Sequence, residues 1–132
     1  MIWVEVLVVF LVCHLVGDFA LQTEWQAQHK RHGLGRDPTA RRALLAHVST
    51  YTLAFVPAFV WLLAEDVSIG LVAAIAVLLF VTHLVQDDGR LLDQYIRHVK
   101  HTEAASHPTV TAALDQSFHV VVLFGLSILA VA

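Results

Sequence analysis

The chain has 132 residues, enough for one domain, and 58% of them are hydrophobic while only 14% are charged. Soluble domains carry about a quarter charged residues, so this composition disfavours a soluble globule, and it excludes intrinsic disorder. The formal net charge of -3 gives no indication of nucleic-acid binding. The single cysteine, Cys13, excludes an internal disulfide and a cysteine-based zinc motif.

Four apolar stretches have about the length that a helix needs to cross a hydrocarbon core about 30 Å thick. They are continuous runs without the alternation of a membrane barrel, so we predict helices rather than strands. The predicted helices cover residues 2–21, 43–63, 67–85 and 110–131. The sequence therefore predicts an all-α fold, an integral membrane four-helix bundle, with residues 1–132 as one transmembrane domain.

Two details refine this prediction. Glu5 lies where a cleaved signal peptide would carry basic residues, so the first stretch is expected to remain in the protein. Pro57 lies inside the second predicted helix and has no N–H to donate to the carbonyl of Leu53. We therefore expect a kink in that helix.

All eight basic residues lie in two predicted loops, residues 23–42 and 89–109. Because cytoplasmic loops carry the excess of Lys and Arg, both loops are expected in the cytoplasm and both termini outside it. The first loop contains Gly33, Gly35 and Pro38, which disfavour a continuous helix there. The second loop contains an apolar stripe with basic residues around it, which predicts an amphipathic helix on the inner leaflet. The stripe consists of Leu91, Leu92, Tyr95, Ile96 and Val99.

Each predicted helix carries a histidine and a second polar residue one helical turn away, on the same face. The pairs are His14 with Asp18, His47 with Tyr51, His83 with Asp87, and Asp115 with His119. Such residues are costly in hydrocarbon, which makes them candidates for a functional site. With a rise of about 1.5 Å per residue, the four histidines reach similar depths near the cytoplasmic ends of the helices. We expect them to converge on one site.

The first and third helices also share a local sequence, in which residues 14–18 (HLVGD) match residues 83–87 (HLVQD). Both helices run from the outside to the inside, so equivalent residues reach the same depth. This match predicts two pseudo-repeated helical hairpins related by an axis along the membrane normal.

Neutral imidazole and carboxylate are good ligands for divalent transition metals, and zinc is the ion we expect first. The preferred ligands are His14, His47 and His83 with one of Asp18 or Asp87. The remaining groups can orient the ligands or hold a second ion.

Three further residues have expected chemical roles beside the metal ligands. Asp115 and His119 are candidates for supporting groups or for a general base, and Tyr51 for a donor to a developing oxyanion. Asp88 and Asp93 are expected to face water. The loop histidines, which have no consistent ligand spacing, are expected to be exposed: His29, His32, His98, His101 and His107.

These motifs resemble a bacterial membrane family catalogued as domain-of-unknown-function family 3307. The long first motif contains His14, Gly17-Asp18-Phe19, Leu21-Gln22-Thr23, Trp25, Ala27 and Lys30; the others are His47-x-x-x-Tyr51, His83-x-x-x-Asp87 and Asp115-Gln116-x-x-His119. The third motif continues to a Lys in that family, where this chain has Arg90. The chain is also similar in architecture to small membrane proteins labelled as metal-dependent hydrolases. The resemblance implies the bacterial cytoplasmic (inner) membrane but no specific activity.

The function expected from the residues is a metal-dependent membrane hydrolase that acts on an ester or phosphoester of a lipid-like substrate at the inner leaflet. The alternatives are a protein that translocates divalent metal or protons, and a scaffold without catalysis. The outer halves of the helices are almost wholly apolar, which counts against a continuous polar path. Membrane lipids are the expected partners, and a homodimer stays an open alternative.

Overall fold

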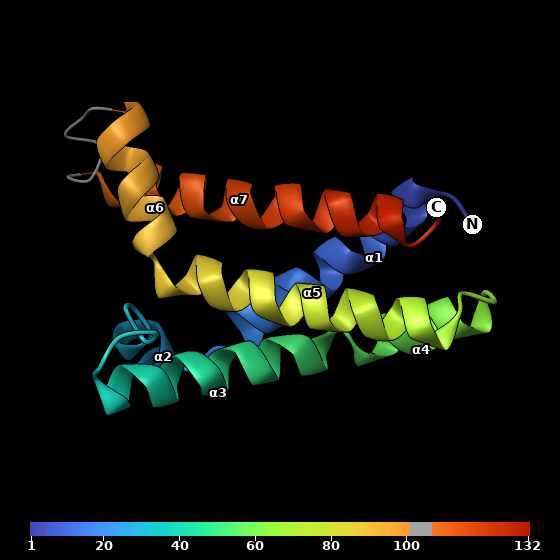
Figure 1. Cartoon of the computed structure of the whole chain (residues 1–132), viewed down its shortest axis with the longest axis horizontal. Coiled ribbons are helices and arrows are strands. Elements are labelled where there is room, and N and C mark those ends of the chain that lie inside the picture. Colours follow the sequence, from blue (N-terminus) through green and yellow to red (C-terminus); the bar gives the residue numbers. More distant parts are fainter. Residues whose placement is uncertain (101–106) are drawn as a thin grey trace.

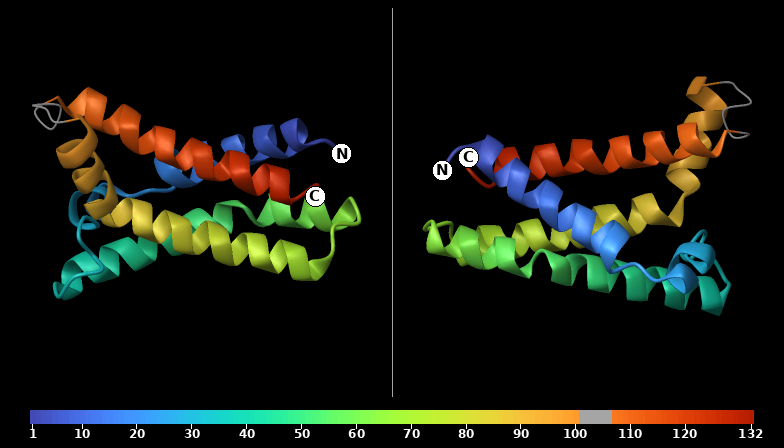
Figure 2. Two further views of the ribbon diagram at one scale, coloured as in Figure 1. Left: turned by 45° about the horizontal axis from the view of Figure 1, so that its top comes forward. Right: turned by 180° about the vertical axis from the view of Figure 1, so that it is seen from behind.

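The computed structural model describes residues 1–100 and 107–132, which form helices joined by short connections. Both termini lie at one end of the bundle, which we call the terminal end, and α2 and α6 lie at the opposite end, the loop end (Figure 1). Figure 2 shows the same arrangement from two further sides. Four helical segments are long and apolar enough to cross a membrane: 3–20, 38–64, 69–88 and 108–129.

The first segment consists of α1 (Trp3–Leu15) and a wider π-helical turn, η1 (Val16–Ala20). Turns of this type inside α-helices are frequent at functional sites. Gly17 lies in this turn, where an added Cβ would come within 2.8 Å of the Tyr51 ring and 3.2 Å of its Cα. The absence of a side chain at Gly17 therefore lets the two segments cross closely beside Asp18.

The second segment is broken at Phe55 into α3 (Pro38–Ala54) and α4 (Val56–Ala64). The predicted kink at Pro57 is confirmed. Helix α3 begins at Pro38, earlier than expected, because the Asp37 side chain accepts the N–H of Thr39 at 2.8 Å and proline suits the first helical position.

Helix α5 (Ile69–Asp88) begins after Ser68, whose side chain accepts the N–H of Leu71. It ends at Gly89, where φ is 82°, a left-handed conformation that glycine adopts without strain. The chain then turns into α6 (Arg90–Tyr95) and a π-helical turn, η2 (Ile96–Lys100), which run across the bundle (Figure 1). The predicted segment is therefore helical, while its place on a leaflet stays a prediction.

Helix α7 (Pro108–Leu129) completes the bundle by packing against α1 and α5, and α3 packs against α5. His101, which the sequence predicts to be exposed, lies outside the described residues. An apolar core fills the terminal half of the bundle and includes Phe10, Phe55, Ile75, Leu79 and Leu123. The core closes the bundle between the polar residues and the terminal end.

The first loop is docked onto the end of α5, and it contains α2 (Glu24–His29). The expectation that Asp88 faces water is wrong, because its side chain is buried and accepts the N–H of Leu34 at 2.8 Å. A cation also contacts Asp88, since Arg90 Nη1 lies 3.2 Å from its carboxylate. The buried Asp88 carboxylate is therefore paired both with a backbone N–H of the loop and with a cation.

A second contact holds the loop to α6. Arg31 and His32 both donate to the Asp93 carboxylate, at 2.6 and 3.2 Å. Partial burial raises the pKa of Asp93, but the hydrogen bonds from His32 and Arg31 outweigh this effect and lower the pKa below its ordinary value. The loop end is thus a folded cap rather than a free linker.

Candidate metal centre

Four side chains from three helical segments meet inside the bundle, and we call them the four-residue cluster: Asp18, His47, His83 and Asp87. All four are at least 95% buried. Each residue offers one ligand atom, and these atoms all lie within 4.8 Å of one another. The i, i+4 spacing explains this in part, because it places His83 and Asp87 on one face of α5.

The interatomic distances in the four-residue cluster are those of a small coordination shell. His47 Nε2 lies 3.1 Å from Asp18 Oδ1, 2.9 Å from Asp87 Oδ2 and 3.1 Å from His83 Nε2. His83 Nε2 lies 3.4 Å from each of the same two carboxylate oxygens. A tetrahedral zinc ion with bonds of about 2.0–2.1 Å holds its ligand atoms about 3.3–3.4 Å apart. The donor set therefore fits a divalent ion in type and in spacing.

The tautomers of the two histidines strengthen this interpretation. Their Nε2 atoms face each other at 3.1 Å, so both cannot carry a hydrogen. Their Nδ1 atoms are buried and have no hydrogen-bond partner among the described residues. A bound cation accounts for two imidazoles and two carboxylates that turn toward one point. The free Nδ1 atoms differ from the usual metal-bound histidine, which donates its second nitrogen to a neighbour.

His14 is not part of this convergence, although the sequence favoured it as a ligand. Its Nε2 donates to Gln116 Oε1 at 2.9 Å, and its Nδ1 accepts from the Tyr51 hydroxyl at 3.0 Å. Gln116 then donates through Nε2 to Asp18 Oδ2 at 3.2 Å. In this series of hydrogen bonds every donor has an acceptor. Neither nitrogen of His14 therefore has a lone pair free for an ion. The series of hydrogen bonds instead fixes the carboxylate of Asp18, whose other oxygen contacts His47 and His83.

Tyr51 lies behind the four-residue cluster rather than in an open site. Its side chain is 1% exposed, and its ring stacks on His83 with the ring centroids 3.5 Å apart and the planes at 5°. Its hydroxyl donates the hydrogen bond that His14 Nδ1 accepts. The geometry therefore differs from the expected oxyanion donor and makes Tyr51 a support for His83 and His14.

Lys30 adds a positive charge that sequence reasoning did not place at the site. Its Nζ lies 2.6 Å from Asp87 Oδ2 and 2.5 Å from Gln22 Oε1. The Lys30 side chain is 17% exposed, so the ammonium stands between the loop end and the buried carboxylate. Lys30 thus shares an oxygen of Asp87 with the two histidines.

A second group of possible ligands shares Asp87 with the four-residue cluster. It consists of Asp87, Asp115 and His119, and we call it the cavity-facing group. His119 Nε2 lies 3.0 Å from Asp87 Oδ1, while its Nδ1 donates to the carbonyl oxygen of Asp115 at 2.8 Å. Asp87 Oδ2 therefore faces the histidines of the four-residue cluster, while its Oδ1 faces His119 of the cavity-facing group.

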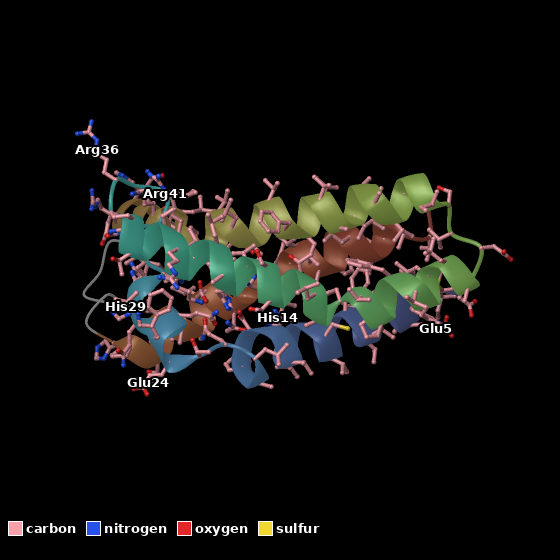
Figure 3. The ribbon with its side chains drawn as sticks, turned by 90° about the horizontal axis from the view of Figure 1, so that it is seen from below. Glu5, His14, Glu24, His29, Arg36 and Arg41 are labelled. Atoms are coloured by element: carbon pink, nitrogen blue, oxygen red, sulfur yellow. The ribbon has the colours of Figure 1, made fainter. Side chains whose placement is uncertain are left out.

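A cavity of about 400 Å³ at the loop end reaches this region. Its lining includes Lys30, Arg31, Asp87, Thr111 and Asp115. In Figure 3, nitrogen and oxygen atoms gather in the half of the bundle near the loop end, beyond His14, and carbon dominates near Glu5. Asp87 and Asp115 therefore belong both to the buried polar groups and to the wall of a cavity at the loop end.

The sequence identified the residues that converge but not how the roles divide among them. Asp18, His47, His83 and Asp87 come together, Asp115 and His119 lie beside them, and His14 and Tyr51 support them. Lys30 and Gln116 were missed as site residues. Both stand inside the motifs that carry the family resemblance, which was the available signal.

A family model described as "Protein of unknown function (DUF3307)" matches residues 6–131. The match includes every residue of the four-residue cluster and of the cavity-facing group. In these comparisons the chain matches no curated protein and no solved structure.

Proposed function

Since the chain belongs to the DUF3307 family, whose description gives no activity, we propose a function from the site itself: metal-dependent hydrolysis of an ester or phosphoester in a lipid-like substrate. The observation that carries the proposal is the four-residue cluster, in which two imidazole nitrogens and two carboxylate oxygens lie 2.9–3.4 Å apart beside a cavity. We take zinc as the ion, because nitrogen and oxygen donors at these spacings suit tetrahedral coordination.

The residues divide into holding, orienting and reacting groups. Asp18, His47, His83 and Asp87 would hold the ion, which supplies Lewis acidity and activates water near neutral pH. The His14–Gln116 chain orients Asp18, so His14 acts as a positioning residue.

Asp115 is the candidate general base, because its carboxylate lines the cavity and its side chain is 31% exposed. A base in the cavity is within reach of a water molecule that enters with substrate. Lys30 and Arg31 line the same cavity and suit the negative charge of a phosphate-bearing headgroup.

The location of the cavity favours hydrolysis over translocation. A carrier for ions or protons needs polar groups on both sides of its binding site. In the described terminal half, the buried side chains beyond the four-residue cluster form an apolar core, and the polar exception, Ser127, donates to the carbonyl of Phe124. The site therefore opens toward the loop end alone among the described residues.

We place the loop end in the cytoplasm and both termini outside a bacterial inner membrane, because all eight basic residues belong to the loop end. In a background without Cys13, cysteines at Arg36 or Arg97 are expected to resist an impermeant thiol reagent applied to intact cells. A cysteine at Glu65, in the turn between α4 and α5, serves as the accessible control. Labelling of the Arg36 or Arg97 positions from outside would contradict this orientation.

The activity is tested by incubating the pure protein in detergent with total inner-membrane lipids, with and without a chelator, and comparing the products by mass. We expect a product that the chelator abolishes. Replacing His47 by Gln should reduce turnover to the level of lipid alone, because it removes a ligand whose Nε2 contacts three other donors.

The matched control is His29→Gln, since His29 is exposed and contacts the carbonyl of Trp25 in its own helix. That variant should keep full turnover. Metal flux into proteoliposomes without a chelator-sensitive lipid product would establish translocation in place of hydrolysis. If neither metal flux nor a chelator-sensitive product is observed, the function that remains is the scaffold without catalysis.

A further inference from the structure

The structure points to a second divalent-cation site, formed by the cavity-facing group, with Asp87 as a carboxylate bridge between two ions. This inference rests on the proposed function and narrows its substrate class to phosphate esters. It starts from the two oxygens of Asp87, since Oδ2 faces His47 and His83 while Oδ1 faces His119. A single ion in the four-residue cluster uses only Oδ2.

The tautomer of His119 is the first argument. A carbonyl oxygen can only accept, so the 2.8 Å contact with the Asp115 carbonyl means that Nδ1 of His119 is the donor. In the neutral ring, Nε2 then presents its lone pair to Asp87 Oδ1 at 3.0 Å. Two acceptors at that distance need a positive charge between them, which is either a proton on Nε2 or a metal ion.

The position of Asp115 favours the metal ion. Its carboxylate is the third donor of the group and lies on the cavity wall, while His119 is 1% exposed. When the second ion is bound, Asp115 is therefore a ligand of that ion, and it is the candidate general base only in the one-ion form. A cation held there by three protein groups would keep coordination positions open toward the cavity, as catalytic metal sites do. The four-residue cluster, by contrast, supplies four donors of its own, so its ion would bind water only by adding a fifth ligand.

Charge defines the ligand that accompanies the second ion. Asp18, Asp87 and Asp115 contribute three negative charges and Lys30 contributes one positive charge. One divalent ion offsets the remaining two negative charges, so a second ion leaves two positive charges beside the cavity. A phosphate group can offset them, and carboxylate-bridged ion pairs about 3.5–4 Å apart are typical of enzymes that cleave phosphate esters. We infer that the second ion binds together with a phosphate-bearing ligand.

The test counts Co²⁺ ions bound per chain to the metal-free protein in detergent, with methylphosphonate as the phosphate probe. We expect two ions for the wild type, one for His119→Gln, and two for the exposed-histidine control His29→Gln. Asp115→Asn, at a part-exposed position, should keep one tight ion and weaken the other by tenfold or more. Electron paramagnetic resonance of the wild type should show two ions coupled through the shared carboxylate.

The outcomes separate the two proposals. One ion in the wild type, unchanged in His119→Gln, would overturn the second site and leave the first intact. Two ions that persist in both His119→Gln and Asp115→Asn, or that show uncoupled spectra, would also overturn it. No bound ion in the wild type would overturn both the second site and the proposed hydrolase.

Discussion

Replacing Asp87 by Asn is expected to abolish divalent-ion binding and to destabilise the chain more than any other substitution at the site. The reason is that one carboxylate contacts His47, His83, His119 and Lys30. Removing one partner from a buried ion pair costs about 3–5 kcal/mol, because the other charge stays buried without compensation. Thermal unfolding in detergent, with and without zinc, measures both effects.

Asp93→Asn is the matched control for Asp87→Asn. It removes a carboxylate that also pairs with a basic residue, Arg31, but that lies in α6 and is 36% exposed. Its unfolding temperature should change little and its affinity for zinc should not change. An Asp87→Asn protein that binds zinc as the wild type does would contradict the assignment of Asp87 as a ligand.

Replacing Lys30 by Met is expected to have opposite effects on the metal-free and the metal-bound protein. Without an ion, the Lys30 ammonium is the cation that contacts Asp87 at 2.6 Å, so its loss leaves Asp87 uncompensated and lowers the unfolding temperature. With an ion present, the same loss removes a competitor for Asp87 Oδ2. We expect zinc to bind about tenfold tighter or more, which corresponds to about 1.4 kcal/mol.

The measurement is the rise in unfolding temperature on adding zinc, which should be larger for Lys30→Met than for the wild type. Arg36→Met is the control, since Arg36 carries the same charge in the same loop and points away from the bundle (Figure 3). It should behave as the wild type in both states. Unchanged or weaker zinc binding by Lys30→Met would show that the ammonium and an ion do not share Asp87.

The sequence predicted the helices, the kink and the convergence of polar residues, because these depend on patterns within single helices. Apolar length identified the spans, Pro57 marked the kink, and a four-residue spacing placed His83 with Asp87 on one face. Depth alone then indicated that the histidines would meet. The length of a helix, the position of its kink and the depth of its residues are properties of that helix alone.

The division of roles depends on contacts between segments, which spacing along one helix does not encode. The sequence does not distinguish His14 from His47, yet it is His14 that forms hydrogen bonds with Tyr51 and Gln116, and these occupy both of its ring nitrogens. The π-helical turn at Val16–Ala20 sets the position of Asp18 in a way that the α-helical period did not predict. Lys30 reaches Asp87 because a folded loop carries it there, 57 positions away in sequence.

The measurement that tests the central claim most directly is zinc X-ray absorption on the wild-type protein loaded with one equivalent of ion. The account predicts retention of one ion per chain after desalting, with about four nitrogen or oxygen ligands at about 2.0–2.1 Å and the outer-shell signature of two imidazoles. That signature should weaken to one imidazole in His47→Gln. A wild-type protein that retains no zinc, or holds it in a shell of water without imidazole, would contradict the account.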